Sequence, residues 1–309
     1  MIERNMNELS EFDETKSWLE NELLKRITVS PELTRVIFVG LTNRTNTGAL
    51  ATTIGRSPTE PRITRHIQPF KAIARQIMES KGVTSSTPLT FLKSTIELTP
   101  GINLIKETIG PNIENPAEWI NSMDLLLSNG ISPNQLTFIP TFRDLFDTIA
   151  SWRFMWNWSL ENFPYDSFNK SLEEVDNKIR FSIKSGIKVI PYVHEFLRDH
   201  KATKVIQRMC QLAEIPFNTS MVKWEETASN GQEDPYFAGS LIKYDQPPDR
   251  WIRGALSTSH GGRGELVWKP LKTGLKLTKD DQKFVLPKIQ SSILIHKKLT
   301  TFARDSLGL

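Results

Sequence analysis

Short apolar runs alternate along the chain with polar, helix-length segments, and this alternation constrains the fold more than any other feature. The apolar runs are rich in β-branched residues and lie at 35–40, 89–92, 102–105, 136–139 and 187–190. Helix-length stretches at 117–128 and 169–184 precede the last two of them. Strands separated by helices form βαβ units, whose strands are parallel. The sequence therefore predicts an α/β fold with a central, mostly parallel sheet flanked by helices.

The two ends of the chain and one long internal stretch lie outside this alternation. Residues 1–30 have a polar amphipathic pattern typical of a helix, and residues 278–305 again carry apolar side chains at helical spacing. The stretch 226–265 is rich in Gly, Ser, Asp and Pro and only weakly periodic, as in functional or disordered loops. Although 309 residues could form two domains, one α/β domain accommodates that length. We therefore expect a single domain, 1–309, with helical additions at both ends.

Charge and cysteine content exclude several classes of protein. The 39 Lys and Arg residues exceed the 35 Asp and Glu residues by only four, far less than in a typical duplex-binding protein. The single Cys210 cannot form an intramolecular disulfide. No apolar run approaches the ~18 residues of a membrane helix, and the acidic N-terminal segment is unlike a signal peptide. We expect a soluble, cytoplasmic protein that binds a small anionic ligand and neither nucleic acid nor membrane.

Basic residues follow three of the predicted strands. Arg44 lies in the loop 41–49, whose Gly, Thr and Asn residues can form a nest of backbone N–H groups before a helix. Lys106 and Arg143 each come directly after a later strand. The carboxyl ends of parallel strands meet at one edge of the sheet, where ligands bind in α/β folds. We therefore expect the three cations to lie close together.

Each of these segments also has a simpler interpretation. The loop 41–49 can equally be a solvated connector, and it lacks the G-x-x-x-x-G-K-[ST] motif of a nucleoside triphosphatase. Arg143 has Asp147 one helical turn away as an ion-pair partner, and Lys106 has the adjacent Glu107. A surface pair of this kind contributes less than about 1 kcal/mol. The argument for a binding site therefore rests on the three segments together.

Taken together, the segments resemble the sulfotransferase family that uses 3′-phosphoadenosine-5′-phosphosulfate (PAPS). The family's phosphosulfate loop has the form [KR]-S-G-T-[ST], and the matching residues here are Arg44, Thr45, Asn46, Thr47 and Gly48, followed by Ala49. The family's second signature is an Arg at a strand end and a Ser eight residues later, which Arg143 and Ser151 match. The resemblance covers about residues 34–270 and implies the P-loop-like central sheet of the sulfotransferase fold.

The resemblance also implies a role for each residue. The loop 44–49 would hold the 5′-phosphosulfate of PAPS, while Arg143 and Ser151 would bind the 3′-phosphate. Arg263, in a segment similar to the family's loop that closes over the cofactor, would be a second ligand of the 3′-phosphate. Asn46 stands where Gly is usual, and Gly48 stands where Ser or Thr is usual. Because Asn tolerates a positive φ better than most residues, the loop can still adopt the backbone that Gly allows.

The acceptor needs a catalytic base, and the base that many relatives use is absent. Lys106 lies in the segment similar to the family's catalytic region, but Thr108 occupies the position where those relatives have His. Glu107 is our first candidate for the base, His66 the second and Glu97 the third. Each has an ordinary structural alternative, because a lone His is commonly hydrogen-bonded and a Glu near a Lys commonly forms a salt bridge.

The resemblance implies a small-metabolite acceptor, sulfated on a hydroxyl or a nitrogen. Acidic residues in 226–251 would favour a cationic acceptor if they line the pocket, and the Asn-, Ile- and Lys-rich composition is typical of AT-rich genomes such as those of toxin-making cyanobacteria. We therefore keep toxin biosynthesis, with a saxitoxin- or cylindrospermopsin-type alkaloid as acceptor, as a hypothesis for a monomeric or homodimeric enzyme. The alternatives are a P-loop-type small-molecule kinase that uses ATP and magnesium, and a non-catalytic nucleotide-binding relative.

No metal site is expected, because the spacing of His194 and His200 places them on opposite sides of a helix.

Overall fold

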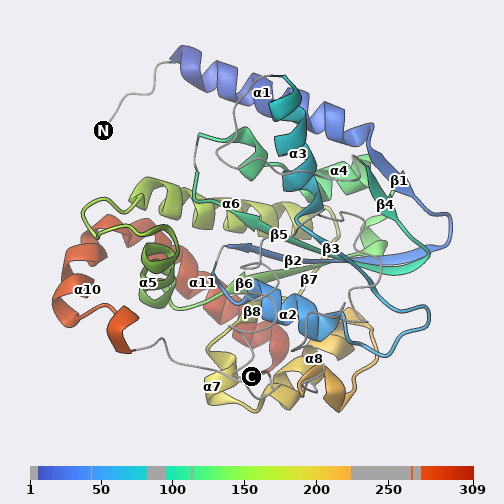
Figure 1. Cartoon of the computed structure of the whole chain (residues 1–309). Helices are drawn as coiled ribbons and strands as arrows, with labels where there is room; N and C mark the ends of the chain where they lie inside the picture. The colour runs from blue at the N-terminus through green and yellow to red at the C-terminus, as the bar shows by residue number, and fades with distance from the viewer. Residues whose placement is uncertain (1–5, 43, 82–94, 113, 224–265, 267–272) are drawn as a thin grey trace, which may run out of the picture.

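A parallel sheet forms the centre of the protein (Figure 1). The computed structural model describes residues 6–42, 44–81, 95–112, 114–223, 266 and 273–309. Within them, six strands form one sheet in the order β3-β5-β2-β6-β7, and β8 pairs with β6 beyond the end of β7. The strands are β2 (Leu33–Thr42), β3 (Thr64–Ile67), β5 (Gly101–Ile109), β6 (Leu136–Phe142), β7 (Lys188–Val189) and β8 (Tyr192–Val193). Each of these pairs is parallel, which confirms the α/β class and the mostly parallel sheet.

Helices cover both faces of this sheet (Figure 1). On one face lie α3 and α6, with α4 beside them and α1 outermost against α3 and α4. On the other face lie α2 and α8, while α11 contacts both α6 and α8 around the β7–β8 side of the sheet. The helix bounds are α1 (Met6–Leu24), α2 (Thr47–Ile54), α3 (Pro69–Ser80), α4 (Ser122–Ser128), α5 (Leu145–Trp156), α6 (Tyr165–Lys184), α7 (Phe196–Asp199), α8 (Ala202–Ala213), α10 (Lys279–Val285) and α11 (Gln290–Leu307).

The core is centred on β2, which lies between β5 and β6. Val36, Ile37 and Val39 are completely buried, as a continuous β-branched run in a doubly covered parallel strand predicts. Phe38 packs edge-on against Phe138 of β6, with ring centroids 6.0 Å apart. Burying each such side chain contributes about 1.5–3 kcal/mol, so β2 is a rigid support for the loop that follows it.

Several boundaries differ from those expected from the sequence. The strand expected at 102–105 extends to Ile109, so Lys106 and Glu107 lie inside it rather than after it. The helix expected over 117–128 begins only at Ser122, because the turn η1 (Pro116–Glu118) precedes it. A separate two-stranded parallel sheet, β1 (Ile27–Val29) with β4 (Ile96–Leu98), was not expected at all. It lies at the amino end of the main sheet, on the right of Figure 1.

The C-terminal region forms two helices where the sequence predicts one over 278–305. Helix α10 ends at Val285, and the turn η8 (Leu286–Lys288) separates it from α11. Pro287 lies in this turn, and proline lacks the backbone N–H that a continuous helix needs. The strand expected at 89–92 and the loop expected at 226–265 both fall outside the described residues.

Within the described ranges, none of the helices combines the length and the apolar composition needed to span a bilayer.

Candidate functional site

The end of β2 has a backbone that few residues can adopt. Gly40 has φ +127°, and a Cβ at this position would lie 2.1 Å from the backbone oxygen of Glu107 on β5. Leu41, Arg44 and Asn46 also have positive φ, at 100°, 67° and 66°. The expectation that position 46 can take this conformation is therefore confirmed. Positive φ on either side of Thr45 turns successive N–H groups inward, as in anion-binding nests.

The loop leads into the N-terminus of α2. Thr47, Gly48 and Ala49 are the first residues of this helix, so their N–H groups have no partner one turn earlier. A helix N-terminus carries roughly half a positive charge, which favours an anion. A Cβ added to Gly48 would meet no atom of the described residues within 4 Å, so there is open space beside this helix start.

Arg44 joins this loop to the helix that follows β6. Its Nε donates a hydrogen bond to Oγ of Ser151 on α5, over 2.9 Å. Burial, and secondarily the positive charge of Arg143, which directly precedes the N-cap of α5, lower the pKa of Arg44. The structure therefore brings together Arg44, Arg143 and Ser151, as the sequence predicts.

Arg143 has both an ion-pair partner and a free donor. Its Nη2 lies 3.2 Å from the carboxylate of Asp147, as the simpler interpretation of the sequence expects. Its Nε is buried, however, and has no hydrogen-bond partner in the described part of the chain. A buried donor without a partner is costly, so this atom is suited to bind a ligand oxygen.

The threonine hydroxyls of the loop point into the protein. Oγ1 of Thr45 donates to the carbonyl of Thr42 over 2.7 Å and lies 2.7 Å from the hydroxyl of Thr141 on β6. The hydroxyl of Thr47 lies 3.1 Å from that of Thr141. All three side chains are buried. The sequence suggests these hydroxyls as phosphate donors, whereas here they fasten the loop to β6 and leave the backbone N–H groups for a ligand.

Lys106 and Glu107 lie on opposite faces of the sheet, because successive side chains of a strand alternate. Lys106 is half-buried, and burial together with the charges of Lys71 and Arg44 lowers its pKa to about 8, although Glu107 opposes this change. The ammonium group is therefore still mostly charged at neutral pH. Lys106 lies three residues before the carboxyl end of β5, and its charge acts together with that of Arg44.

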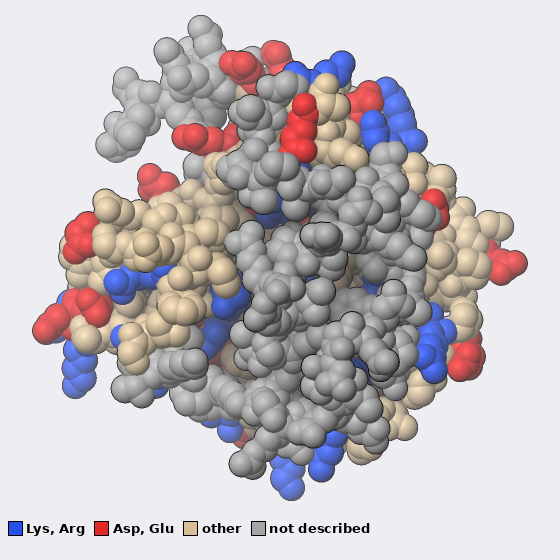
Figure 2. Space-filling view, viewed as in Figure 1, with Lys and Arg blue, Asp and Glu red and all other residues tan. Residues whose placement is uncertain are grey.

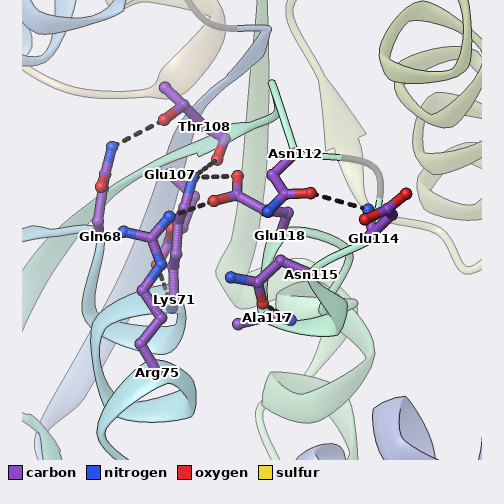
Figure 3. Close-up of polar contacts among 10 residues, drawn as sticks. All are labelled: Gln68, Lys71, Arg75, Glu107, Thr108, Asn112, Glu114, Asn115, Ala117 and Glu118. Carbon is purple, nitrogen blue, oxygen red and sulfur yellow. Dashed lines mark hydrogen bonds and ion pairs between the residues drawn. The ribbon is translucent and has the colours of Figure 1, made fainter. Parts of the chain in front are cut away.

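Glu107 belongs to a buried network between β5, α3 and η1 (Figure 3). Its Oε1 accepts hydrogen bonds from the backbone N–H groups of Phe70, at 2.9 Å, and Lys71, at 3.5 Å. The Lys71 ammonium donates to the carbonyl of Thr108, at 3.2 Å, and pairs with Glu118. Burial raises the pKa of Glu107 to about 7, although Lys71 opposes this change. The carboxyl group can therefore gain or lose a proton near neutral pH.

A small cavity of about 10 Å³ adjoins this network, large enough for one water molecule. Glu107 and Thr108 line it, as do Leu41 of β2 and Lys178 of α6. The hydroxyl of Thr108 accepts a hydrogen bond from Nε2 of Gln68 over 2.7 Å. Thus Thr108, at the position where the resemblance would place a histidine, lies in the same network as Glu107.

The other two candidate bases lie on β3 and β4. His66, on β3, is buried, and its Nε2 lies 2.9 Å from Oδ1 of Asn103. Burial lowers the pKa of His66 to about 4, so the ring is neutral at physiological pH. Glu97 lies on β4, at the amino end of the sheet, and the structure does not bring it to the carboxyl edge. Arg263 lies outside the described residues.

Two residues that the sequence did not suggest as part of the site lie beside the loop. Nδ1 of His194 lies 3.1 Å from Nδ2 of Asn46, and the hydroxyl of Tyr192 lies 3.5 Å from the same ring nitrogen. Tyr192 lies on β8, and His194 is the first residue after this strand. If the strand predicted at 187–190 had been extended past Ile190, Tyr192 and His194 would have been expected on one face of it, because they are two residues apart.

Figure 2 shows blue and red side chains interspersed around the rim of the visible face, as the small net charge of +4 leads one to expect. In the described ranges, no three His, Cys, Asp or Glu side chains come together as a metal site. No protein-family model and no curated protein sequence matches the chain. The function therefore has to be argued from the site itself.

Proposed function

We propose that this protein is a PAPS-dependent sulfotransferase with the sulfotransferase fold, acting on a hydroxyl or nitrogen of a small molecule. The observation that carries the proposal is the hydrogen bond from Arg44 to Ser151. It joins the loop after β2 to the helix after β6, the two segments that resemble the family's phosphosulfate and 3′-phosphate sites. Arg143, which has the spacing to Ser151 that the resemblance requires, directly precedes the N-cap of the same helix, and its charge acts on Arg44.

The topology of the sheet supports a ligand at this position. The chain passes from β2 to β3 and β5 on one side of β2, and then crosses to β6 and β7 on the other side. The carboxyl end of β2 is therefore the point where the strand order reverses. In open α/β sheets this point is where ligands bind.

The residues present fit a ligand with two separate anionic groups. The N–H groups at the start of α2, beside the open space at Gly48, suit one anion, and the unpartnered Nε of Arg143 suits another. When bound, PAPS supplies the sulfuryl group and its leaving group is adenosine 3′,5′-bisphosphate. In this proposal Arg44 and Lys106 hold positive charge near the phosphosulfate, and Arg143 and Ser151 hold the 3′-phosphate. Transfer of this kind depends mainly on positioning and charge stabilisation.

We assign the role of acceptor base to Glu107. A general base works best when its pKa lies near the working pH, and burial brings that of Glu107 to about 7. His66 is the second candidate, because its ring is neutral and its buried Nδ1 has no hydrogen-bond partner among the described residues. Glu97 would need an approach to the carboxyl edge that the structure does not show.

The first test is thermal unfolding with adenosine 3′,5′-bisphosphate, adenosine 5′-monophosphate, or ATP with magnesium. At a hundred times its dissociation constant, a specific ligand stabilises the fold by ~2.7 kcal/mol, which raises Tm by about 4 °C for a chain of 309 residues. We expect this shift with the bisphosphate and a much smaller one with the monophosphate, which lacks the 3′-phosphate. Arg143→Ala should lose most of the shift with the bisphosphate, whereas Arg180→Ala, on the exposed side of α6, should keep it and so controls for loss of charge alone.

The outcomes separate the competing functions. A shift with the bisphosphate justifies screening acceptors with PAPS, beginning with cationic metabolites. A shift with ATP and magnesium alone would replace the proposal by the kinase alternative. Binding of the bisphosphate with no turnover of any acceptor would point to a non-catalytic relative. No shift with any of the three ligands would contradict the proposal.

A further inference from the structure

The side chain of Asn46 ties the loop to the strand beyond β6. Its Nδ2 lies 3.1 Å from Nδ1 of His194, a contact that spans 148 residues of sequence. The hydroxyl of Tyr192 lies 3.5 Å from the same ring nitrogen. A glycine, which the resemblance would place at this position, has no side chain to make such a contact.

His194 is in the protonation state that this contact requires. Burial, and secondarily the charge of Arg143, lower the pKa of His194 to about 3, so its ring is neutral at physiological pH. A neutral ring has one donor and one acceptor nitrogen. Because the Nδ2 group of Asn46 can only donate, Nδ1 of His194 is the acceptor and Nε2 carries the proton.

Glu195, the residue after His194, contacts the start of α5, which carries Arg143 and Ser151 of the site. Oε1 of Glu195 accepts a hydrogen bond from the backbone N–H of Asp144 over 3.1 Å. Asp144 is the N-cap of α5, where its carboxylate accepts from the N–H of Asp147 over 2.9 Å. Arg143 comes immediately before this cap, and Ser151 lies two turns into the helix. Of these two consecutive residues, His194 therefore contacts the loop after β2, and Glu195 contacts the start of the helix after β6.

We propose that His194 and Glu195 are positioning residues that fix the two halves of the anion-binding site relative to each other. His194 holds Asn46 in its left-handed conformation, and Glu195 holds the start of α5. The inference rests on the proposed function, because the halves are those assigned above to the two anionic groups of PAPS. A loop that is already held does not have to be ordered when the ligand binds, so the contact with Asn46 increases affinity without touching the ligand.

The test for the loop compares variants that break or keep the acceptor at position 194. His194→Leu removes Nδ1, whereas His194→Asn keeps an amide oxygen close to the same position. Asn46→Gly removes the amide but still allows a positive φ. His200→Leu, a histidine of the same segment that does not contact the loop in the described structure, is the matched control. Each variant is measured by hydrogen–deuterium exchange of residues 44–50 without ligand and by its affinity for adenosine 3′,5′-bisphosphate.

We expect His194→Leu and Asn46→Gly each to speed amide exchange in the loop and to weaken bisphosphate binding roughly 2- to 12-fold, the range of one neutral hydrogen bond. The double variant should be no worse than either single variant, because both remove the same contact. His194→Asn should restore slow exchange and most of the affinity. Unchanged exchange in His194→Leu, or effects that multiply in the double variant, would overturn the role of His194.

The role of Glu195 is tested at the start of α5. Glu195→Met removes the acceptor for the N–H of Asp144, whereas Glu195→Gln keeps it. Exchange of residues 144–148 should be faster in the first variant only, and equal exchange in both would overturn this half of the proposal. If the wild-type protein fails to bind the bisphosphate, the proposed function fails, while the exchange measurements still decide the positioning. If His194→Leu does not fold, Asn46→Gly removes the same hydrogen bond and decides the question.

Discussion

Replacing Glu107 by Gln should stabilise the protein at mildly alkaline pH and slow the proposed reaction. The carboxylate is only 5% exposed and accepts backbone N–H groups from Phe70 and Lys71. Burial raises its pKa from the usual 4.5 to about 7. At about 1.4 kcal/mol per pKa unit, this rise corresponds to roughly 3 kcal/mol between the protonated and ionised forms. Gln keeps an oxygen for both N–H groups and carries no charge, so it removes that cost.

The sign of the pH dependence follows from proton linkage. Because the pKa of Glu107 is higher in the folded state than in the unfolded state, its contribution to the free energy of unfolding is complete below about pH 4.5. That contribution is lost as the pH rises through about 7. Glu107→Gln should therefore be nearly as stable as the wild type at about pH 5 and up to about 3 kcal/mol more stable at about pH 8. In Tm, the difference at the higher pH is about 5 °C for a chain of 309 residues.

Urea unfolding between about pH 5 and pH 8 measures this difference, and Glu214 provides a control of opposite sign. Lys188 and Arg35 lower the pKa of Glu214 to about 2, so the stability it contributes is present above pH 4.5 and is lost in acid. Glu214→Gln should thus lose stability at neutral pH. An effect of Glu107→Gln that is the same at both pH values would refute the argument that burial perturbs this carboxyl group.

The same variant tests the assignment of the base. Once an acceptor is known, Glu107→Gln should lower kcat by roughly 10²–10⁴, the usual contribution of a general base, with bisphosphate affinity nearly unchanged. Turnover at the wild-type rate would transfer the role to His66 or, less directly, to Glu97.

Three further substitutions address the anion site, the buried network and the loop. Arg143→Ala should weaken binding of adenosine 3′,5′-bisphosphate by about 1.5–3 kcal/mol, measured by calorimetry, because it removes charged hydrogen bonds; unchanged affinity would contradict the clamp. Glu118→Gln should destabilise the fold by about 3–5 kcal/mol in urea unfolding, since Lys71 and Arg75 both pair with this fully buried carboxylate. Gly40→Ala should cost about 2–4 kcal/mol, because its Cβ would lie 2.1 Å from a backbone oxygen of β5; a variant with the wild-type Tm would rule out that crowding.

The parts of the site that could be predicted from the sequence are those set by local patterns. The β-branched run of β2 and the polar turn after it predict a strand, a loop and a helix start. The separation of eight residues between Arg143 and Ser151 predicts that both lie on the helix after β6 or at its start. The convergence of Arg44 with these two residues follows from the parallel sheet, because the carboxyl ends of its strands meet at one edge.

The parts that could not be predicted depend on where a strand ends and on contacts between distant segments. β5 continues to Ile109, so strand alternation places Glu107 on the face opposite to Lys106. The residue that meets Asn46 is 148 positions away, and Thr141, whose hydroxyl lies within hydrogen-bonding distance of those of Thr45 and Thr47, is more than 90 positions away from both. No local propensity encodes such pairings, which exist only once the sheet is assembled.

The large sequence separation of these contacting residues has a consequence for how the protein folds. The hydrogen bond between Arg44 and Ser151 spans 107 residues, and that between Asn46 and His194 spans 148. A chain in which β6 and β8 have not yet docked on β2 therefore has no binding site. Non-local contacts of this kind form late, after the slow closure of long loops. A ligand at this site should accordingly slow unfolding while leaving the rate of folding almost unchanged, so that it prolongs the life of the native protein without helping the chain to reach it.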